Sequence, residues 1–427
     1  MTGHSTDPRH RRRVILLLPT ATYRSDFVDA ADALGIEVVV ASNVRQAMAG
    51  DMGDRAIVVD FSHVGAAVEV IADLHARAPV DAVVAVDEQG VALAAAASAR
   101  LGFAHNPLSA VEATHDKLRL RKTLQSRGVS QPAFAAHLPG GPDGLAFECV
   151  DAVGGFPVVV KPLRLSGSQG VIRVDDAQSL RLTIDRVRTI ACAPSEPVLI
   201  EQYVPGCEVA VEGLLRDGVL EVLAVFDKPD PLIGPYFEET MYVTPSRLHT
   251  SVFEQVVSLV NAAVRALGLV EGPIHAEVRI DDSTGAAPEP SASPNRMWII
   301  EVAGRSIGGL CARTLRFGLG ITLEQLILRH ALAMSLPTLK RERIASGVLM
   351  IPIDGGGTLE RVEGLDEVHQ LAGIRGLEIT VPIGTTVQPL PEGDRYLGFV
   401  FASGESPAAV EAALRLARSL IRPIWAT

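Results

Sequence analysis

The N-terminal part of the chain alternates short apolar segments with segments of helical pattern. The apolar segments are residues 14–18, 36–41, 56–61 and 83–86. Between the first two, residues 27–34 fit an amphipathic helix that ends at Gly35, a common terminating residue. Strands that are separated by helices pair in parallel, because a parallel pair needs a crossover connection. We therefore expect residues 1–112 to form a doubly wound α/β domain.

Four residues follow the first and fourth of these strands, namely Pro19, Thr20, Asp87 and Glu88. Ligands bind open α/β sheets beyond the carboxyl ends of the strands, so these residues would lie on the ligand edge. No GxGxxG sequence follows the first strand, which argues against a dinucleotide cofactor. Since carboxylates also stabilise helix N-termini, we expect Asp87 and Glu88 to cap a helix over residues 91–97, with ligand binding as the alternative.

The size and charge of the chain restrict the class of protein. Its 427 residues predict about two to four domains. A formal net charge of −11 argues against a nucleic-acid partner, which is itself polyanionic. It leaves room for a small anionic ligand held by a few lysines and arginines.

The cysteines and the hydropathy pattern indicate a soluble cytoplasmic protein. The four cysteines are scattered without a CxxC pair, so we expect neither a zinc site nor a disulfide framework. An apolar run follows Arg11, Arg12 and Arg13 but stops at Pro19, which is too short for a signal peptide. No apolar stretch approaches the ~20 residues that span a bilayer, and we expect no membrane partner.

A lysine and a Gly/Ser-rich loop follow one another in the next part of the chain. Lys161 ends the apolar segment 156–162, where a charge is costly unless an anion pairs with it. For this lysine alone we favour extension of the side chain to solvent. The loop at residues 164–171 lacks the Walker A spacing, yet its backbone N–H groups could surround phosphate oxygens. A simple hairpin turn is the alternative.

Two later segments, residues 274–280 and 298–305, read as paired strands. In the first, alternation places Ile274, Ala276, Val278 and Ile280 on one face and Glu277 on the other. In the second, it places Trp298, Ile300 and Val302 together and Glu301 opposite. Two glutamates on one face suit a hard divalent cation, while solvated surface carboxylates are the alternative. A polar loop, residues 281–295, joins the strands.

Several other elements are expected from local pattern. Thr114 would cap a basic helix, Asp217-Gly218 would turn a hairpin, and residues 236–245 would be irregular. Helices are expected over residues 253–267, 312–317 and 322–336, and a structural role is favoured for His275 over substrate contact. After residue 347, short strands and a helix capped by Ser406 predict a small α+β domain.

The order of these motifs resembles the ATP-grasp superfamily of carboxylate–amine ligases. That family combines a basic helix, a VVKP strand, a glycine-rich flap, an E-x-x-V hinge and two metal-binding carboxylates before an arginine. The segments Glu301 to Gly309, 317–321 and 391–400 are similar to the dipeptide-forming L-amino-acid ligases. The resemblance implies a pre-ATP-grasp domain (1–112), an ATP-grasp domain (113–336, in subdomains 113–205 and 206–336 that clamp ATP) and a C-terminal domain (337–427).

The resemblance also assigns roles to residues at matching positions. Those implied to bind ATP are Lys117, Lys161, Ser166, Gly167, Ser168, Gly170, Glu201, Gln202, Tyr203, Val204 and Glu208. Those implied to bind the substrate are Glu239, Tyr242, Arg305, Gly308 and Gly309. Glu277 and Glu301 match the metal ligands, while Arg305 and Lys161 match residues that act on the reacting groups. Ala303 replaces an asparagine ligand of many family members, so metal binding would rest on the two glutamates, phosphates and water.

The implied activity is ADP-forming ligation of a carboxylate, such as an amino acid, to an amine, which we expect to be another amino acid, through an acyl phosphate. ATP and Mg²⁺, with Mn²⁺ as an alternative ion, are the implied cofactors. The implied partners are small molecules, and the family implies a homodimer. The rival interpretations are another ATP-grasp enzyme, of the purine pathway or of the carboxylase type, and a non-catalytic ATP-binding module. The sequence contains no biotin-attachment sequence, which argues against the carboxylase.

Overall fold

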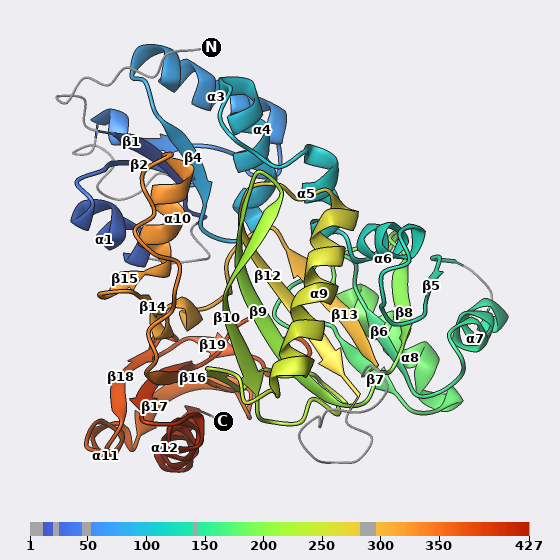
Figure 1. Cartoon of the computed structure of the whole chain (residues 1–427). Helices are drawn as coiled ribbons and strands as arrows, with labels where there is room; N and C mark the ends of the chain where they lie inside the picture. The colour runs from blue at the N-terminus through green and yellow to red at the C-terminus, as the bar shows by residue number, and fades with distance from the viewer. Residues whose placement is uncertain (1–11, 20–24, 45–52, 141–142, 282–295, 427) are drawn as a thin grey trace.

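The computed structural model describes residues 12–19, 25–44, 53–140, 143–281 and 296–426. In Figure 1 an N-terminal parallel sheet lies above long central strands, a small sheet with its own helices lies to one side, and the C-terminal strands lie below. The polar loop predicted at residues 281–295 lies outside the described residues except for Asp281, and so does Thr20 on the predicted ligand edge.

The N-terminal sheet has the order β3-β2-β1-β4, and all its pairs are parallel. Its strands are β1 (Arg13–Leu17), β2 (Glu37–Ser42), β3 (Ala56–Val58) and β4 (Ala82–Ala85). Val14 and Leu16 face one apolar cluster with α1 (Ser25–Ala33) and α10 (Leu323–Ala331), while Ile15 and Leu17 face another with α3 (Val64–Arg77) and α4 (Val91–Leu101). Coverage of both faces explains the continuous apolar run of β1. The predicted doubly wound arrangement is confirmed.

Two short helices lead out of this unit, α5 (Leu108–His115) and α6 (Lys117–Ser126). Asp116 separates them, and its carboxylate accepts hydrogen bonds from the N–H groups of Leu118 and Arg119. The prediction of a Thr114 cap was wrong, because the Thr114 hydroxyl donates to Val111 O inside α5. Asp116 thereby fixes the first residue of α6, which is Lys117.

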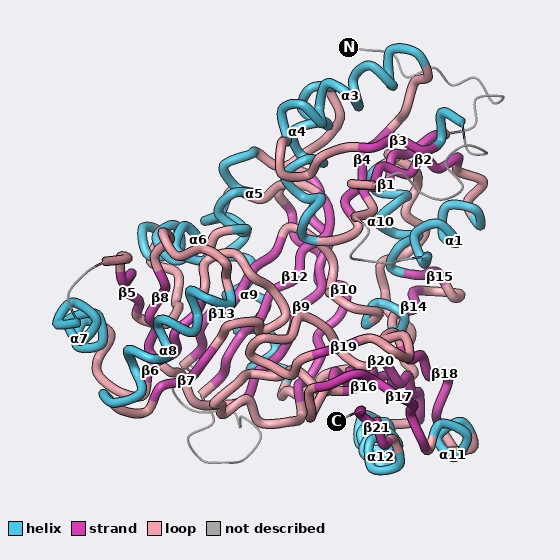
Figure 2. The backbone as a smooth tube through the Cα atoms, turned by 180° about the vertical axis from the view of Figure 1, so that it is seen from behind, coloured by secondary structure: helices cyan, strands magenta, loops and turns pink. Residues whose placement is uncertain are grey.

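A small antiparallel sheet follows, with the order β5-β8-β6-β7. Its strands are β5 (Phe134–His137), β6 (Val158–Lys161), β7 (Ile172–Val174) and β8 (Val198–Gln202). Helices α7 (Asp143–Ala152) and α8 (Ala177–Ile190) bury its apolar face. Seen from behind, this sheet lies on one side of the central strands and the C-terminal strands lie on the other side (Figure 2). The Gly/Ser loop joins β6 to β7.

The central sheet has eight strands in the order β13-β12-β9-β10-β11-β16-β20-β18. Strands β9 (Cys207–Arg216) and β10 (Val219–Lys228) turn at Asp217 and Gly218, whose positive φ angles of 51° and 76° are typical of a tight hairpin turn. Helix α9 (Thr250–Leu267) covers one face of the sheet. The segment 236–245, predicted to be irregular, contains β11 (Met241–Thr244), which is held between β10 and β16.

A bulge interrupts the pairing of β12 (Gly272–Ile280) with β13 (Met297–Ala303). Glu277 pairs with Glu301, but the next residue, Val278, pairs with Ile299. The extra residue, Ile300, reverses the alternation, as a bulge does. The core under α9 therefore contains Met297, Ile299 and Val302. The prediction that Trp298, Ile300 and Val302 share one face was wrong.

The C-terminal segment extends the central sheet and adds a smaller one. Strands β16 (Ala345–Ile351), β18 (Ile374–Ile379) and β20 (Gly398–Gly404) join the eight-stranded sheet, and α12 (Pro407–Leu420) packs on it. The predicted Ser406 cap is confirmed, since its hydroxyl accepts from Ala409 N–H. A second sheet has the order β19-β17-β21, with β17 (Gly357–Glu363), β19 (Thr386–Val387) and β21 (Arg422–Ala426), and α11 (Leu365–His369) lies between β17 and β18 in the chain.

The remaining connections are short. The helix predicted at residues 312–317 is a 3-10 turn over Cys311–Thr314 followed by β14 (Arg316–Phe317), which pairs with β15 (Ile321–Thr322). None of the helices in the described ranges has the length and apolarity that crossing a bilayer requires. The domain boundaries at residues 112, 205 and 336 remain predictions.

Candidate functional site

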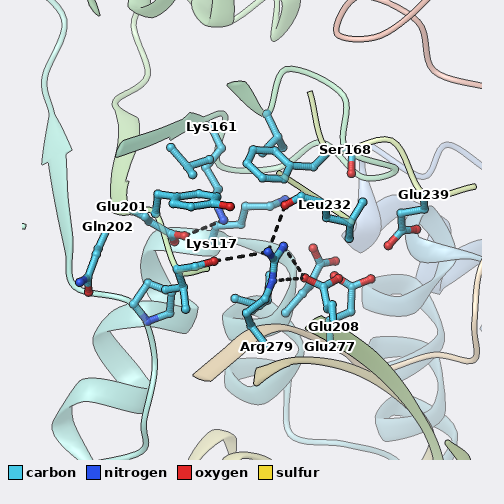
Figure 3. Close-up of a pocket in the computed structure, with 18 of the residues that line it drawn as sticks. Lys117, Lys161, Ser168, Glu201, Gln202, Glu208, Leu232, Glu239, Glu277 and Arg279 are labelled. Carbon is cyan, nitrogen blue, oxygen red and sulfur yellow. Dashed lines mark hydrogen bonds and ion pairs between the residues drawn. The ribbon is translucent and has the colours of Figure 1, made fainter. Parts of the chain in front are cut away.

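A pocket lies between the small sheet and the central sheet (Figure 3). Its walls come from α6, β6, the Gly/Ser loop, β8 and the segment after it, β9, β12 and β13. It brings together most of the predicted site residues: Lys117, Lys161, Ser166, Ser168, Glu201, Gln202, Tyr203, Val204, Glu208, Glu239, Glu277 and Glu301. Lys117 and Glu301, which are 184 positions apart in the sequence, therefore share one pocket.

One end of the pocket is built on a buried ion cluster around Glu201. The Arg121 Nε lies 2.6 Å from one carboxylate oxygen of Glu201, and Lys161 Nζ lies 2.6 Å from the other. Lys161 is 7% exposed, so the predicted extension to solvent was wrong. Pairing with Glu201 is what makes its burial tolerable.

The charges of this cluster shift the pKa values of Glu201 and Lys161. Burial would raise the pKa of Glu201, but the charges of Arg121 and Lys161 lower it to about 2. Burial lowers the pKa of Lys161, and the nearby charge of Arg121 lowers it further, while the charge of Glu201 raises it. Two cations thus share one carboxylate, which leaves an excess of positive charge facing the pocket.

Lys117 and the Gly/Ser loop continue this positive end. Lys117 begins α6, and its ammonium group donates to the carbonyl oxygen of Leu165, at the start of the loop. Gly167, Ser168 and Gly170 have positive φ angles of 62°, 59° and 70°. This left-handed path, easiest for glycine, turns the backbone tightly beside the pocket.

The tip of the Gly/Ser loop is held by the C-terminal segment. Gly170 N–H donates to Pro391 O at 2.9 Å, and the Gln169 side chain donates to Glu392 O at 2.9 Å. From α8, Arg186 meets the Glu392 carboxylate with two bonds of 2.6 and 3.0 Å. We call the pair Arg186 and Glu392 the latch.

The wall between the two ends of the pocket is apolar and aromatic. Val159, Leu232 and Phe237 form a small cluster with Tyr203, which follows β8. The rings of Tyr203 and Phe237 lie 6.4 Å apart, and Arg173 lies over the Tyr203 ring. An apolar and aromatic wall of this kind suits a flat ligand group.

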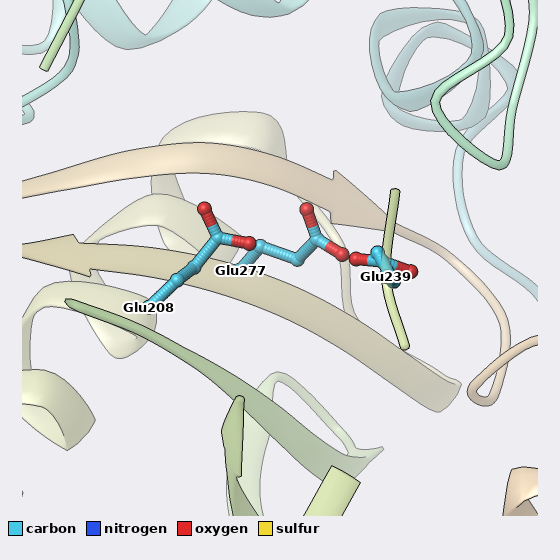
Figure 4. A group of neighbouring side chains, drawn as sticks. All are labelled: Glu208, Glu239 and Glu277. Carbon is cyan, nitrogen blue, oxygen red and sulfur yellow. The ribbon is translucent and has the colours of Figure 1, made fainter. Parts of the chain in front are cut away.

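The other end of the pocket is built on a buried lysine that no motif marked. Lys228, at the end of β10, lies 2.7 Å from Glu208 and 2.9 Å from Glu277 and also contacts Glu239. Figure 4 shows these three glutamates, and one oxygen of each lies within 4.8 Å of the others. Arg279 donates to Glu208 from β12. Oxygen donors in this number and spacing suit Mg²⁺ or Mn²⁺.

The shared lysine separates the pKa values of two neighbouring glutamates. Burial and the charge of Glu277 raise the pKa of Glu239 to about 7, although Lys228 opposes this. For Glu277, burial is outweighed by Lys228 and His275, which hold its pKa well below the usual range. Lys228 itself has a strongly raised pKa, because the three carboxylates outweigh burial. This end carries an excess of negative charge.

The predicted metal pair is only partly brought together. Glu301 lies opposite Glu277 in the ladder and lines the pocket, and the Ile300 bulge directs it there. The three-carboxylate group contains Glu277 but takes Glu208 and Glu239 in place of Glu301.

His275 is buried, as a structural histidine would be, with its ring between Glu212 and Glu277. Burial lowers its pKa, but these two glutamates raise it to about 9.

Arg305 lies outside the pocket lining and contacts the N-terminal unit. Its Nε is 2.7 Å from the Glu88 carboxylate, which also accepts from His115 at 3.1 Å. Burial raises the pKa of Glu88, but Arg305 and His115 lower it to about 2. Of the two residues expected to cap a helix, Asp87 does cap the 3-10 turn before α4, whereas Glu88 pairs with Arg305.

Of the other predicted substrate residues, Glu239 lines the pocket, whereas Tyr242, Gly308 and Gly309 lie outside its lining. Tyr242 is buried in the core, its ring 5.1 Å from Lys228 Nζ. Gly309 has a φ of 58°, and an added Cβ would come within 2.9 Å of Phe399. Gly308 lies beside Arg305. Sequence reasoning missed Lys228, Arg121 and Arg279, of which only Lys228 carried a signal: like Lys161, it ends an apolar strand.

Comparison with known proteins gives matches along most of the chain. The family described as "ATP-grasp domain" matches residues 154–314, "ATP-grasp N-terminal domain" matches 28–105, and "L-amino acid ligase C-terminal domain 2" matches 349–426. A crystal structure of L-amino acid ligase from Bacillus licheniformis is 25% identical, has a TM-score of 0.80, and aligns over 98% of this chain and 99% of that one.

The curated relatives include ligases. D-alanine–D-alanine ligase of Cupriavidus taiwanensis is 29% identical over 228 residues, which are 52% of this chain and 64% of that protein. Alanine–anticapsin ligase of Bacillus subtilis (strain 168) is 25% identical over 268 residues, which are 58% of this chain and 53% of that protein. The chain thus spans less than two thirds of the length of these relatives.

Proposed function

Since this chain is an ATP-grasp protein with a C-terminal domain of the L-amino-acid-ligase type, we propose that it is an ADP-forming ligase. It joins an amino acid or similar carboxylate to an amine, which we take to be another amino acid. The observation that carries this proposal is the opposite charge of the two ends of one pocket. Phosphoryl transfer requires mainly positioning and charge neutralisation, and the pocket offers both kinds of charge.

The positive end is assigned to the phosphates of ATP. Lys117 and Lys161 would neutralise phosphate oxygens, and the loop from Ser166 to Gly170 would cover them with the N–H groups of residues 166–168. The segment Glu201–Val204 would receive the adenine through its backbone, with the rings of Tyr203 and Phe237 beside it. ATP would supply a γ-phosphoryl group that activates the carboxylate as an acyl phosphate for attack by the amine.

The negative end is assigned to Mg²⁺ or Mn²⁺. Glu277 and Glu301 remain the proposed ligands, and Glu208 and Glu239 add carboxylate oxygens to the same end of the pocket. The resemblance implies that Glu208 binds the ribose of ATP. Its bonds to Lys228 and Arg279 would hold it in place for binding either the ribose or the metal ion. The ion would supply charge neutralisation at the phosphates.

Arg305 and Glu88 are assigned to the amino-acid substrate, together with Glu239, Tyr242, Gly308 and Gly309. An amino acid is a zwitterion, and an adjacent guanidinium and carboxylate present the complementary charges to its two ends. A planar guanidinium suits a carboxylate and then an acyl phosphate, because its donors form a fork. Glu88 would hold Arg305 in position until the substrate arrives.

The Gly/Ser loop is assigned to excluding water from the pocket. An acyl phosphate hydrolyses when water reaches it, so closure of a loop preserves the reaction. The latch and the bond from Gly170 to Pro391 would hold the loop closed from the C-terminal segment. The C-terminal segment therefore serves the reaction as well as the fold.

The remaining assignments concern surroundings and partners. All four cysteines lie in the described residues and none of them forms a disulfide, which suits a reducing compartment, and we place the protein in the cytoplasm with small molecules as partners. We extend the homodimer of the implied family to this chain as part of the proposal. The domain boundaries at 112, 205 and 336 are proposed on the same basis.

The test is a screen of amino-acid pairs for ATP-dependent phosphate release, with the mass of each product confirmed. The proposal expects release that requires both amino acids and yields a mass equal to their sum minus water. Glu277→Ala and Glu301→Ala should abolish it. The proposal would be contradicted if phosphate release required bicarbonate or a nucleotide precursor. It would also be contradicted if the protein bound ATP but turned over no amino-acid pair.

A further inference from the structure

Glu212 is a fully buried carboxylate that lies outside the pocket lining. It occupies the middle of β9 and is 1% exposed, and its neighbour Val211 belongs to the core under α9. Burying a carboxylate costs several kcal/mol unless charged or hydrogen-bonding partners compensate. The identity of its partners therefore indicates what the residue is for.

Its two oxygens have different partners from distant parts of the chain. His275 Nδ1, directly opposite in the β9–β12 ladder, lies 2.5 Å from Oε1. The backbone N–H of Ile307 donates to Oε2 at 3.0 Å. The carboxylate thus binds a strand on one side and a loop on the other.

Each partner leads to a residue of the proposed site. The second ring nitrogen of His275 lies 3.5 Å from Glu277 Oε1, so one arm supports a proposed metal ligand. Ile307 comes two residues after Arg305, so the other arm fixes the loop that carries the proposed carboxylate-binding residue. Because the pair Glu277 and Arg305 must act on neighbouring atoms, their relative position has to be set closely.

We propose that Glu212 is a positioning residue that couples the metal-binding end of the site to the Arg305 loop. The effect of Glu212 on catalysis rests on the proposed function, whereas its contacts with His275 and Ile307 do not. Residues behind metal ligands typically change metal affinity or activity by about 10- to 100-fold when they are removed. A carboxylate is needed because it has an acceptor oxygen for each arm.

The experiment compares Glu212→Ala, Glu212→Gln and the wild type with three readouts. Hydrogen exchange at the Ile307 amide reports the loop arm, Mn²⁺ binding without nucleotide reports the His275 arm, and steady-state kinetics report the reaction. In Glu212→Ala we expect Ile307 exchange at least roughly tenfold faster and Mn²⁺ affinity about 10- to 100-fold lower. We expect kcat to fall by a similar factor, with the KM for ATP within about twofold of wild type, since Lys117 and Lys161 lie elsewhere.

Glu212→Gln keeps one acceptor oxygen, so it should retain one arm and give intermediate values. Val211→Ala is the matched control: it shares the strand, points to the opposite face and should change neither exchange nor Mn²⁺ affinity. Unchanged Ile307 exchange and Mn²⁺ affinity in folded Glu212→Ala would overturn the proposal. If the wild type formed no amide, the proposed function would be wrong. Faster Ile307 exchange together with weaker Mn²⁺ binding in Glu212→Ala would still support the coupling role of Glu212.

Discussion

Two lysines, Lys161 and Lys228, each end a strand and are each 7% exposed, yet their surroundings are opposite. Lys161 shares a single carboxylate, Glu201, with Arg121. Lys228 lies among Glu208, Glu239 and Glu277. The pKa of Lys161 is lowered, mainly by burial, whereas that of Lys228 is raised, because its three carboxylates outweigh burial.

The difference shows how one residue type can serve two purposes. The Lys161 cluster retains positive charge and suits a polyphosphate, whereas the Lys228 cluster retains negative charge and suits a divalent cation. In this account Lys228 neutralises the carboxylates when no metal is bound.

The first prediction removes the lysine from the negative cluster. Lys228→Met should lower the free energy of unfolding by about 3–5 kcal/mol, because it leaves buried carboxylates unpaired. Added Mn²⁺ should recover much of this loss, since a ligand that binds only the folded state stabilises it. Urea unfolding with and without Mn²⁺ measures both effects. Lys122→Met, on the exposed side of α6, is the control, and a Lys228→Met protein as stable as this control would contradict the account.

The second prediction removes the lysine from the positive cluster. Lys161→Met should reduce ATP-dependent turnover by about 10²- to 10³-fold, as removal of a transition-state donor commonly does. Mn²⁺ affinity without nucleotide should stay unchanged, because the carboxylate cluster is intact. Steady-state kinetics and Mn²⁺ titration test the two parts. Turnover within twofold of wild type would exclude Lys161 from the reaction.

The third prediction concerns acid. Glu201 has a folded pKa of about 2, below its ordinary value of 4.5. A depressed pKa contributes stability that is present above pH 4.5 and is lost as pH falls towards 2, on the order of 3 kcal/mol for this buried group. Unfolding free energies between pH 6 and pH 3 should decline more steeply in wild type than in Glu201→Gln. Parallel curves would show that the cluster does not titrate in this way.

The fourth prediction tests the latch. Glu392→Gln should change the free energy of unfolding by less than about 1 kcal/mol, because both latch residues are partly exposed. It should instead increase the share of ATP hydrolysed without amide formation, since the loop would close less completely. The ratio of phosphate to product measures this share. In the reversed pair Arg186→Glu with Glu392→Arg, a restored ratio supports the latch, and a ratio as poor as in Glu392→Gln contradicts it.

Sequence reasoning recovered the parts of the fold that follow local periodicity. The parallel N-terminal sheet and helices such as α9 and α12 carry their burial pattern in consecutive residues. Strand β11 and the 3-10 turn after Leu310 are too short for a pattern and are held by neighbouring elements. The bulge at Ile300 reverses alternation in mid-strand, which no periodic rule anticipates.

The site was predictable where one segment carried the signal. Lys161 and Glu277 each interrupt an apolar strand with a charge, so their positions drew attention. The partners that set their electrostatics come from far along the chain: Arg121 is 80 residues from Glu201, and Arg305 is 217 residues from Glu88. Such pairs depend on the tertiary fold, and local pattern does not contain them.

The proposed function requires opposite ends of one pocket to bind a cation and a polyphosphate. Calorimetric titration of Glu277→Gln and Lys161→Met with Mn²⁺ alone, and with ATP in the presence of a chelator, tests it most directly. The account predicts that Glu277→Gln loses at least about tenfold in Mn²⁺ affinity with ATP binding retained, and that Lys161→Met shows the reverse. Equal losses of both ligands in both variants, or full Mn²⁺ affinity in Glu277→Gln, would contradict it.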